Sequence, residues 1–256
     1  MQYIETGLLV SAQRWDMSKP KIKGGRVTLL GRNAGDNPDL IGLRRIVPSM
    51  PFETFDRLRA YPVPGMFDLL MDVQQGSEGR DIETLESVKN NGRVDQSQLL
   101  SYFNPVSGQT KPDSYYSPTV GSIVGLAVSA TCYDMEDEED PDGPRIQGAS
   151  VVFIQPFKQT GENVLGFEVF EVRMDFALFE KLAALGLPGE YRFDCMMSSR
   201  TLRRVGRAAK RHTPSLYITG IQGDNTLTVE RLNNFFGMSV KPVSSAVPPA
   251  VPAHKV

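Results

Sequence analysis

The sequence predicts a mainly β protein made of two tandem OB-fold-like five-stranded barrels, each with a short helix between strands three and four. Three observations support this fold class. The chain repeats itself, apolar and polar residues alternate along the repeated segments, and one helical pattern interrupts the strands in each copy. A pair of other small β-sandwiches or barrels is the alternative, because strand order alone does not determine how a sheet closes.

The repeat starts near the N-terminus. The stretch "GLLVSAQRWDM" at 7–17 returns as "GLAVSATCYDM" at 125–135, an offset of 118 residues. The offset grows to 124 residues where "KGGRVTLLG" at 23–31 matches "QGASVVFIQ" at 147–155, and it then stays constant. A duplicated unit decides the architecture, so we expect two similar domains.

The first three strands of each copy follow from composition and alternation. The first strand is predicted to be half-buried, because its residues alternate between an apolar set and a second set: Leu8, Val10 and Ala12 against Ser11, Gln13 and Trp15. Strands two and three are rich in β-branched and aromatic residues. Gly42 and its match Gly166 fall inside the third strand and predict a bulge or a sharp bend.

A helix and two further strands complete each copy. Phe52, Phe55 and Leu58 recur at three-residue spacing, which predicts a short amphipathic helix, and a Pro-Gly pair then ends it. Alternation in strand four predicts that its aromatic residues lie in the core, namely Phe67, Tyr191 and Phe193. Strand five is clear at 215–222 and fainter at 98–103, while 76–97 is expected to be a polar hairpin excursion. After residue 223 we expect an extra strand and a short helix that packs back on the barrel.

These elements divide the chain into four parts. The first OB-like domain spans 1–103, and a linker rich in proline and small polar residues spans 104–120. The second OB-like domain spans 121–237. The segment 238–256 is rich in proline, alanine and valine and is expected to be disordered.

Composition excludes several classes of protein. The 256 residues are 40% hydrophobic and 23% charged with a net charge of −2, typical of a soluble globular protein. No apolar run approaches the roughly 20 residues that a membrane-spanning helix needs, and no secretory leader is recognisable, so we expect a cytoplasmic protein. Cys132 and Cys195 fit small core residues better than a disulfide framework or a metal site.

Catalysis, cofactors and metals are not expected. The two histidines, His212 and His254, have no neighbours that specify a nucleophilic arrangement, and no Walker loop is present. The acidic run at 136–143 lacks the closing glutamate of a calcium loop, because position 149 is alanine. A solvated surface loop is the better interpretation of this run.

Cations are concentrated in one loop of each copy. In copy one they follow strand one, where phosphate binding and a plain solvated loop are equally good interpretations: Lys19, Lys21, Lys23 and Arg26. In copy two they lie between strands four and five without any acidic residue among them, which favours contact with a polyanion: Arg200, Arg203, Arg204, Arg207, Lys210 and Arg211.

Two aromatic residues occupy matching places beside these loops. Trp15 and Tyr133 alternate with polar residues and are therefore expected on the polar face of the first strand of each copy. Exposed rings beside cationic loops are typical of proteins that bind single-stranded nucleic acid, because bases stack on the rings while cations follow the backbone. In the alternative, a bulge turns both rings into the core.

The segment "LPGEYRFDCMMSSRTLRRVGRAAKRHTPSLYITGIQ" at 187–222 resembles the second half of the small single-stranded DNA-binding proteins of filamentous phages, the gene V type. The basic loop after strand one is similar to the DNA-binding wing of that family. The family consists of short single barrels that work as dimers, so this longer chain looks like a fused pseudo-dimer. The tail lacks the acidic tip by which bacterial single-strand binding proteins recruit partners.

The sequence therefore favours a non-catalytic protein that coats single-stranded DNA in phage or mobile-element replication, with RNA as the other nucleic acid. Self-association is expected and membrane binding is not. The alternative function is a structural or assembly module, in which the acidic loop at 136–142 docks on the basic segment of a neighbouring copy.

Overall fold

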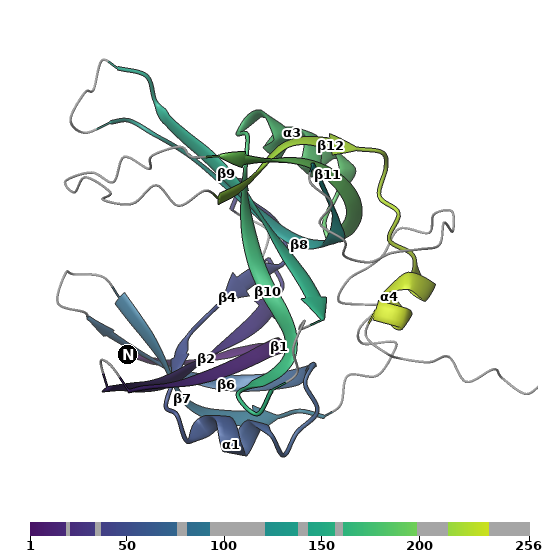
Figure 1. Cartoon of the computed structure of the whole chain (residues 1–256). Helices are drawn as coiled ribbons and strands as arrows, with labels where there is room; N and C mark the ends of the chain where they lie inside the picture. Colours follow the sequence, from purple (N-terminus) through teal and green to yellow (C-terminus); the bar gives the residue numbers. More distant parts are fainter. Residues whose placement is uncertain are drawn as a thin grey trace, which may run out of the picture.

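The computed structural model describes residues 1–18, 21–33, 37–75, 81–92, 121–137, 143–156, 161–198 and 215–235. Within these ranges the protein is mainly β: twelve strands form one continuous sheet, accompanied by three short helices (Figure 1). The expected linker at 104–120, the expected strand at 98–103 and the tail at 238–256 lie outside the described residues.

Five strands of the C-terminal half close a barrel. They are β8 (Ser122–Met135), β9 (Ile146–Pro156), β10 (Val164–Met174), β11 (Gly189–Ser198) and β12 (Ser215–Gln222). β8 pairs antiparallel with β9 and β11, β9 with β10, and β11 with β12. A parallel pairing of β10 with β12 completes the ring. The helix α3 (Ala177–Leu185) lies between β10 and β11 in the chain and covers one end of the barrel in Figure 1.

The N-terminal half repeats this scheme of pairings with more interruptions. Its elements are β1 (Gln2–Ser18), β2 (Lys21–Gly31), β3 (Leu40–Gly42), β4 (Arg44–Ile46), β5 (Ser49–Met50), α1 (Thr54–Leu58), β6 (Gly65–Gln75) and β7 (Asp81–Asn90). β1, β2, β5, β7 and β6 pair in a ring in that order, and only the β5–β7 pairing is parallel. The expected third strand at 40–47 is therefore divided into β3 and β4, and β5 follows it.

The fifth strand of the first ring is β7, whereas we expected this strand at 98–103 and a polar hairpin excursion at 76–97. The sequence of β7 is mostly polar because only one face of the strand meets the core. Leu85 is buried and Val88 packs against the same cluster, whereas Ile82 on this strand is exposed. Two inward residues in a strand of this length are too few to be recognised by periodicity.

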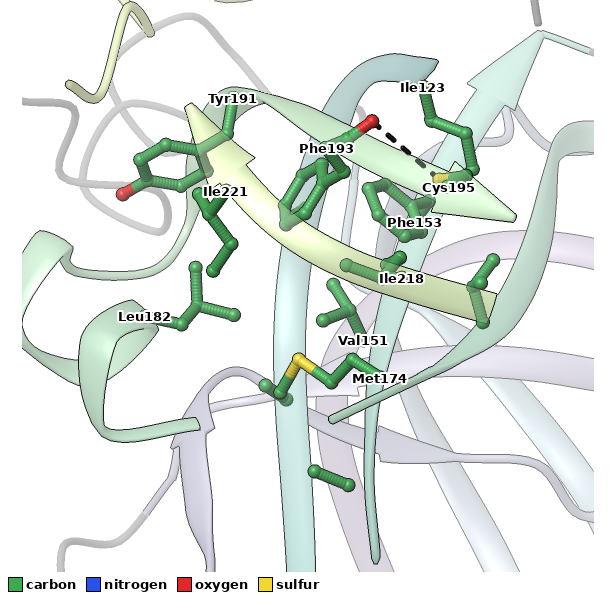
Figure 2. Close-up of a cluster of buried hydrophobic side chains, with 14 of the residues drawn as sticks. Ile123, Val151, Phe153, Met174, Leu182, Tyr191, Phe193, Cys195, Ile218 and Ile221 are labelled. Carbon is green, nitrogen blue, oxygen red and sulfur yellow. Dashed lines mark hydrogen bonds between the residues drawn. The ribbon is translucent and has the colours of Figure 1, made fainter. Parts of the chain in front are cut away.

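Aromatic side chains from the fourth strands fill both barrels, as expected. Phe67, Tyr191 and Phe193 are buried, which confirms their prediction as core residues. Figure 2 shows the C-terminal core, where side chains of β9, β11 and β12 meet and Leu182 of α3 approaches from one side. The rings of Phe153 and Phe193 meet edge to face, with their centroids 5.1 Å apart. The hydroxyl of Tyr191 donates to the backbone carbonyl of Leu185 at 2.9 Å.

One strand of each half pairs with a strand of the other half. β3 pairs with β8, so that Gly42 lies opposite Ser129, and β10 pairs with β1, so that Gly166 lies opposite Ser11. Two further hydrogen bonds are equivalent as well. The Arg14 N–H donates to the Asn163 carbonyl, and the Cys132 N–H donates to the Asp39 carbonyl, both at 3.0 Å. The two halves are therefore joined by reciprocal pairing through their backbones.

A third hydrophobic cluster lies between the two barrels. Its largest contributions come from matching strands: Leu8, Val10, Leu30 and Leu43 on one side, and Leu126, Val128, Val152 and Ile154 on the other. This cluster corrects the expectation that the first strand is half-buried. Leu9 faces the barrel core while Leu8 and Val10 face the cluster between the barrels, so both faces of β1 are buried there.

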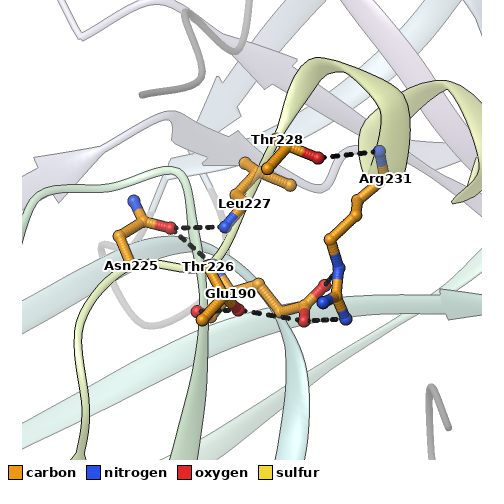
Figure 3. Close-up of polar contacts among 6 residues, drawn as sticks. All are labelled: Glu190, Asn225, Thr226, Leu227, Thr228 and Arg231. Carbon is orange, nitrogen blue, oxygen red and sulfur yellow. Dashed lines mark hydrogen bonds and ion pairs between the residues drawn. The ribbon is translucent and has the colours of Figure 1, made fainter. Parts of the chain in front are cut away.

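The helix α4 (Val229–Phe235; Figure 1) extends this cluster, since Leu227 and Leu232 pack into it. Glu190 of β11 is 1% exposed and pairs with the guanidinium of Arg231, while the Thr226 hydroxyl donates to the Glu190 carboxylate at 3.1 Å (Figure 3). The Thr228 hydroxyl accepts the Arg231 N–H at 3.1 Å. The expected helix after residue 223 is confirmed, but no strand forms at 224–228.

Candidate nucleic-acid interface

Two antiparallel ribbons extend from the barrels, and each is the continuation of the first two strands of one half. We define the first arm as residues 13–18 of β1 with 21–26 of β2, and the second arm as 131–135 of β8 with 146–150 of β9. Figure 1 shows the second arm reaching beyond its barrel at the upper left. The ribbons place the sequence-predicted aromatic residues outside the closed rings.

On each arm the predicted aromatic ring lies against a glycine of the opposite strand. Trp15 is opposite Gly24, and Tyr133 is opposite Gly148. A Cβ added to Gly24 would lie 3.5 Å from the indole, and a Cβ added to Gly148 would lie 2.3 Å from the phenol ring. Because glycine has no side chain, each ring can settle on the backbone of the neighbouring strand. Trp15 is partly buried, Tyr133 is 43% exposed, and neither belongs to the three hydrophobic clusters.

Further apolar side chains lie on the same face of each arm as the ring. On the first arm they are Met17, 48% exposed, and Ile22, 47% exposed, which face each other across the ribbon. On the second arm the equivalent pair is Met135, 53% exposed, and the partly buried Ile146. Side chains two residues apart share a face of a strand, so each arm carries one apolar face. The repeat contained this signal, because both methionines and both isoleucines occupy matching positions.

The predicted cations of the first arm are divided between its two faces. Arg26 lies on the Trp15 face, opposite Gln13, whose side-chain oxygen accepts its guanidinium N–H at 3.1 Å. Lys21 and Lys23 lie on the other face, opposite Ser18 and Asp16. Lys23 forms an ion pair with Asp16 at 2.8 Å. Arg26 is therefore the predicted cation that accompanies the tryptophan, while Lys19 lies outside the described residues.

Arg14 is an arginine of this region that sequence reasoning did not select. Its guanidinium lies 4.8 Å from the ring centroids of both Phe52 and Phe55, pairs with Asp56 at 2.7 Å and donates to Asn163 at 2.9 Å. These contacts tie the first arm to α1 and to the loop before β10. The second half offered no hint of this role, because cysteine occupies the matching position 132.

The second arm differs from the first arm in charge. The Asp134 carboxylate accepts hydrogen bonds from Arg145 at 2.6 Å and from Gln147 at 3.2 Å, and the bond from Arg145 lowers the pKa of Asp134. Glu136 pairs with the same arginine. Around the second arm the described residues 131–137 and 143–150 carry three carboxylates and one arginine, a net charge of −2. The first arm carries four cations and one carboxylate, a net charge of +3. A phosphate backbone is attracted to the first arm and repelled by the second.

The other predicted charged segment lies outside the described residues. This segment lies between strands four and five of the second copy and contains the six cations predicted there: Arg200, Arg203, Arg204, Arg207, Lys210 and Arg211. Most of the acidic loop at 136–142 is outside them too. The alternative assembly function, which joins these two segments, stays a prediction.

Among the described residues, no cluster of three or more His, Cys, Asp or Glu side chains could hold a metal ion. Burial raises the pKa of Cys195 to about 11 and also raises the pKa of Cys132, which makes both thiols weak nucleophiles. A cavity of about 310 Å³ between α1 and β7 has Arg57 as its one charged lining residue. None of the described helices is long and apolar enough to cross a membrane.

Comparison with protein-family models and with curated proteins finds no match for this chain. The function therefore has to be inferred from the arms themselves.

Proposed function

We propose that this chain is a non-catalytic, cytoplasmic protein that binds single-stranded DNA in phage or mobile-element replication, and that it consists of two duplicated OB-like barrels. Each barrel would have its helix between strands three and four. Binding needs no cofactor in this proposal, and RNA is the alternative ligand. The interface consists of the exposed ribbon faces beside the barrels.

Matching pairings support the duplication. β1 is irregular between Leu9 and Ser11, and β8 is irregular between Ala127 and Ser129, at positions 118 residues apart. The two aromatic–glycine pairs and the two glycines at the strand crossings obey the offsets found in the sequence. Independent sequences have no reason to place bulges and crossings at the same positions, whereas copies of one ancestral domain do.

The observation that carries the binding proposal is the indole of Trp15 on an exposed ribbon face beside Arg26. A ring supported from below by Gly24 is held in a fixed orientation, so a base can stack on it without first ordering the side chain. Arg26 can follow a neighbouring phosphate from the same face. The net charge of +3 on this arm draws the strand to it. Tyr133 is the second stacking candidate, on a face whose surroundings are acidic.

Titration with oligothymidine tests the proposal. Trp15 is the single tryptophan of the chain, so its emission reports the first arm alone. We expect quenching on binding and an affinity that falls steeply with salt. Trp15→Ala is expected to cost about 1 to 3 kcal/mol of binding free energy, measured by anisotropy of a labelled oligonucleotide. Tyr61→Ala is the control, because Tyr61 is an exposed aromatic residue that belongs to neither arm.

The two faces of the first arm allow a sharper comparison. Arg26→Ala should reduce the slope of log affinity against log salt by about 0.7, the value for one phosphate contact to a single strand. Lys23→Ala should leave that slope unchanged, since Lys23 is paired with Asp16 on the other face. If the oligonucleotide binds without quenching Trp15, or if Lys23→Ala lowers the slope more than Arg26→Ala, the proposed face is wrong.

A further inference from the structure

We propose that the first arm of one copy docks on the second arm of another copy, apolar face against apolar face, so that chains associate head to tail. This self-association goes beyond binding of nucleic acid and does not depend on it. It uses the described faces of the two arms and is distinct from docking of the acidic loop on the basic segment.

The two apolar faces leave side chains in water that a partner could cover. Met17 and Ile22 on the first arm and Met135 on the second arm are each close to half exposed. Methionine adapts its shape to a partner surface, and a ring beside it provides a rigid anchor. Because each face is a flat two-stranded ribbon, two such faces can stack as packed sheets do.

Charge identifies the occupant as a second copy of this chain. Two first arms, each with a net charge of +3, repel one another, and so do two second arms, because the described residues around each one, 131–137 and 143–150, carry a net charge of −2. A first arm and a second arm attract. The surface therefore favours a heterologous contact between unlike arms over a symmetric contact between like arms.

The contact has to join separate chains. Within one chain the arms belong to different barrels, and the exposed fractions of their apolar side chains show that these faces are uncovered. A pair of docked chains still has an undocked second arm at one end and an undocked first arm at the other. Further chains can therefore be added, and the assembly does not close on itself. Two short ribbons bury far less than the roughly 1,200 Å² of a standard stable interface, so we expect weak association that increases with concentration.

Docking would compete with nucleic acid for the first arm. The face that carries Trp15 can be covered either by the second arm of a neighbour or by a stacked base. A protein held in head-to-tail chains would therefore release its first arm when a single strand arrives. This consequence requires the proposed DNA binding, but the contact between arms does not.

Sedimentation equilibrium of the full chain, free of nucleic acid, tests the contact. We expect the average mass to rise with protein concentration at low salt and to fall at high salt. The emission of Trp15 should shift to shorter wavelength over the same concentrations, because docking buries the indole. Met135→Glu on the second arm should reduce the association constant by roughly tenfold or more. Met197→Glu is the matched control, since Met197 is 63% exposed but lies outside the arms.

Charge reversal distinguishes unlike-arm contact from other association. Lys21→Glu lowers the net charge of the first arm from +3 to +1, and Glu136→Lys removes the net negative charge around the second arm. Each variant should therefore weaken association at low salt. The contact is overturned if mass does not depend on concentration, if Met197→Glu acts like Met135→Glu, or if neither charge variant weakens association. If Met135→Glu leaves the mass unchanged but weakens oligonucleotide binding in dilute solution, the second arm binds nucleic acid instead. If the protein associates as expected but does not bind the oligonucleotide, the proposed function is wrong and the contact between arms is unaffected.

Discussion

Two glycines show how a single missing side chain shapes the exposed faces. Gly24 and Gly148 each have an aromatic ring laid against them from the opposite strand. The fit differs between the arms. The indole of Trp15 leaves ordinary van der Waals room above Gly24, whereas the phenol of Tyr133 occupies the place where a Cβ on Gly148 would lie. Tyr133 therefore depends on its glycine more strongly than Trp15 does.

An alanine at each position tests this difference. Gly148→Ala should displace the Tyr133 ring and lower the free energy of unfolding by about 1 to 3 kcal/mol, because the side chain must leave its rotamer or the strands must separate. Gly24→Ala should change the free energy of unfolding by about 0.5 kcal/mol or less. Urea denaturation of both variants measures the two values. Equal losses would show that the ring of Tyr133 does not rest on Gly148.

Individual residues were predictable where the alternation of a strand was clear. Phe67, Tyr191 and Phe193 are core residues as predicted, because they alternate with polar neighbours on fourth strands. Arg14 was not predictable. Its partners Phe52, Asp56 and Asn163 come from separate parts of the chain, and only folding brings them together.

At the scale of elements, the crossings at Gly42 and Gly166 connect the two halves. Both residues have positive φ, +82° and +78°. A Cβ on Gly42 would lie 2.5 Å from the Val128 carbonyl oxygen, and a Cβ on Gly166 would lie 2.2 Å from the Val10 carbonyl oxygen. Each glycine thus allows one half to pass directly against the backbone of the other. The sequence indicated a bend here, but it did not reveal that the bend serves a pairing between halves.

Alanine at either crossing should be severely destabilising. Gly42→Ala and Gly166→Ala should each lower the free energy of unfolding by about 2 to 5 kcal/mol, since a backbone penalty adds to a clash with a carbonyl that cannot move away. Gly92→Ala is the control: Gly92 also has positive φ, but nothing lies within 4 Å of its Cβ position. Gly92→Ala should lower the free energy of unfolding by about 1 to 2 kcal/mol, because only the backbone penalty of positive φ applies. Denaturation with urea measures all three.

The strand β7 could not be predicted from hydrophobic periodicity. Its pairing with β6 and its single parallel pair with β5 complete the first ring. With one buried residue, Leu85, and one partly buried neighbour, Val88, the hydrophobic signal is weaker than that of the expected strand at 98–103. Hydrogen bonds to neighbouring strands, rather than apolar content, make this segment a strand.

At the scale of the whole molecule, the cluster between the barrels makes the halves depend on each other. Leu8 and Leu126 lie in this shared cluster, and backbone pairing crosses it in both directions. α4 adds Leu232 to the same cluster and is fixed by the buried pair of Glu190 and Arg231. Loss of this cluster would leave both barrels with uncovered apolar surface.

We therefore expect the described halves to unfold together. Leu8→Ala should lower the free energy of unfolding by about 2 to 5 kcal/mol. Hydrogen exchange followed by mass spectrometry should show faster exchange in β11 of the second half as well as in β6 of the first half. Faster exchange confined to β6 would mean that the barrels are independent domains joined by a linker.

The sequence by itself determined that this protein is mainly β, that its halves share a pattern, and that Trp15 and Tyr133 occupy equivalent positions, because repetition and alternation are local properties of the chain. Only the tertiary structure decided that strands of one half pair with strands of the other half, that Arg26 accompanies Trp15 while Lys23 does not, and that the two arms differ in surrounding charge. Strand register and the path of the chain between barrels set these relations. They depend on contacts between residues far apart in the sequence, which no local pattern contains.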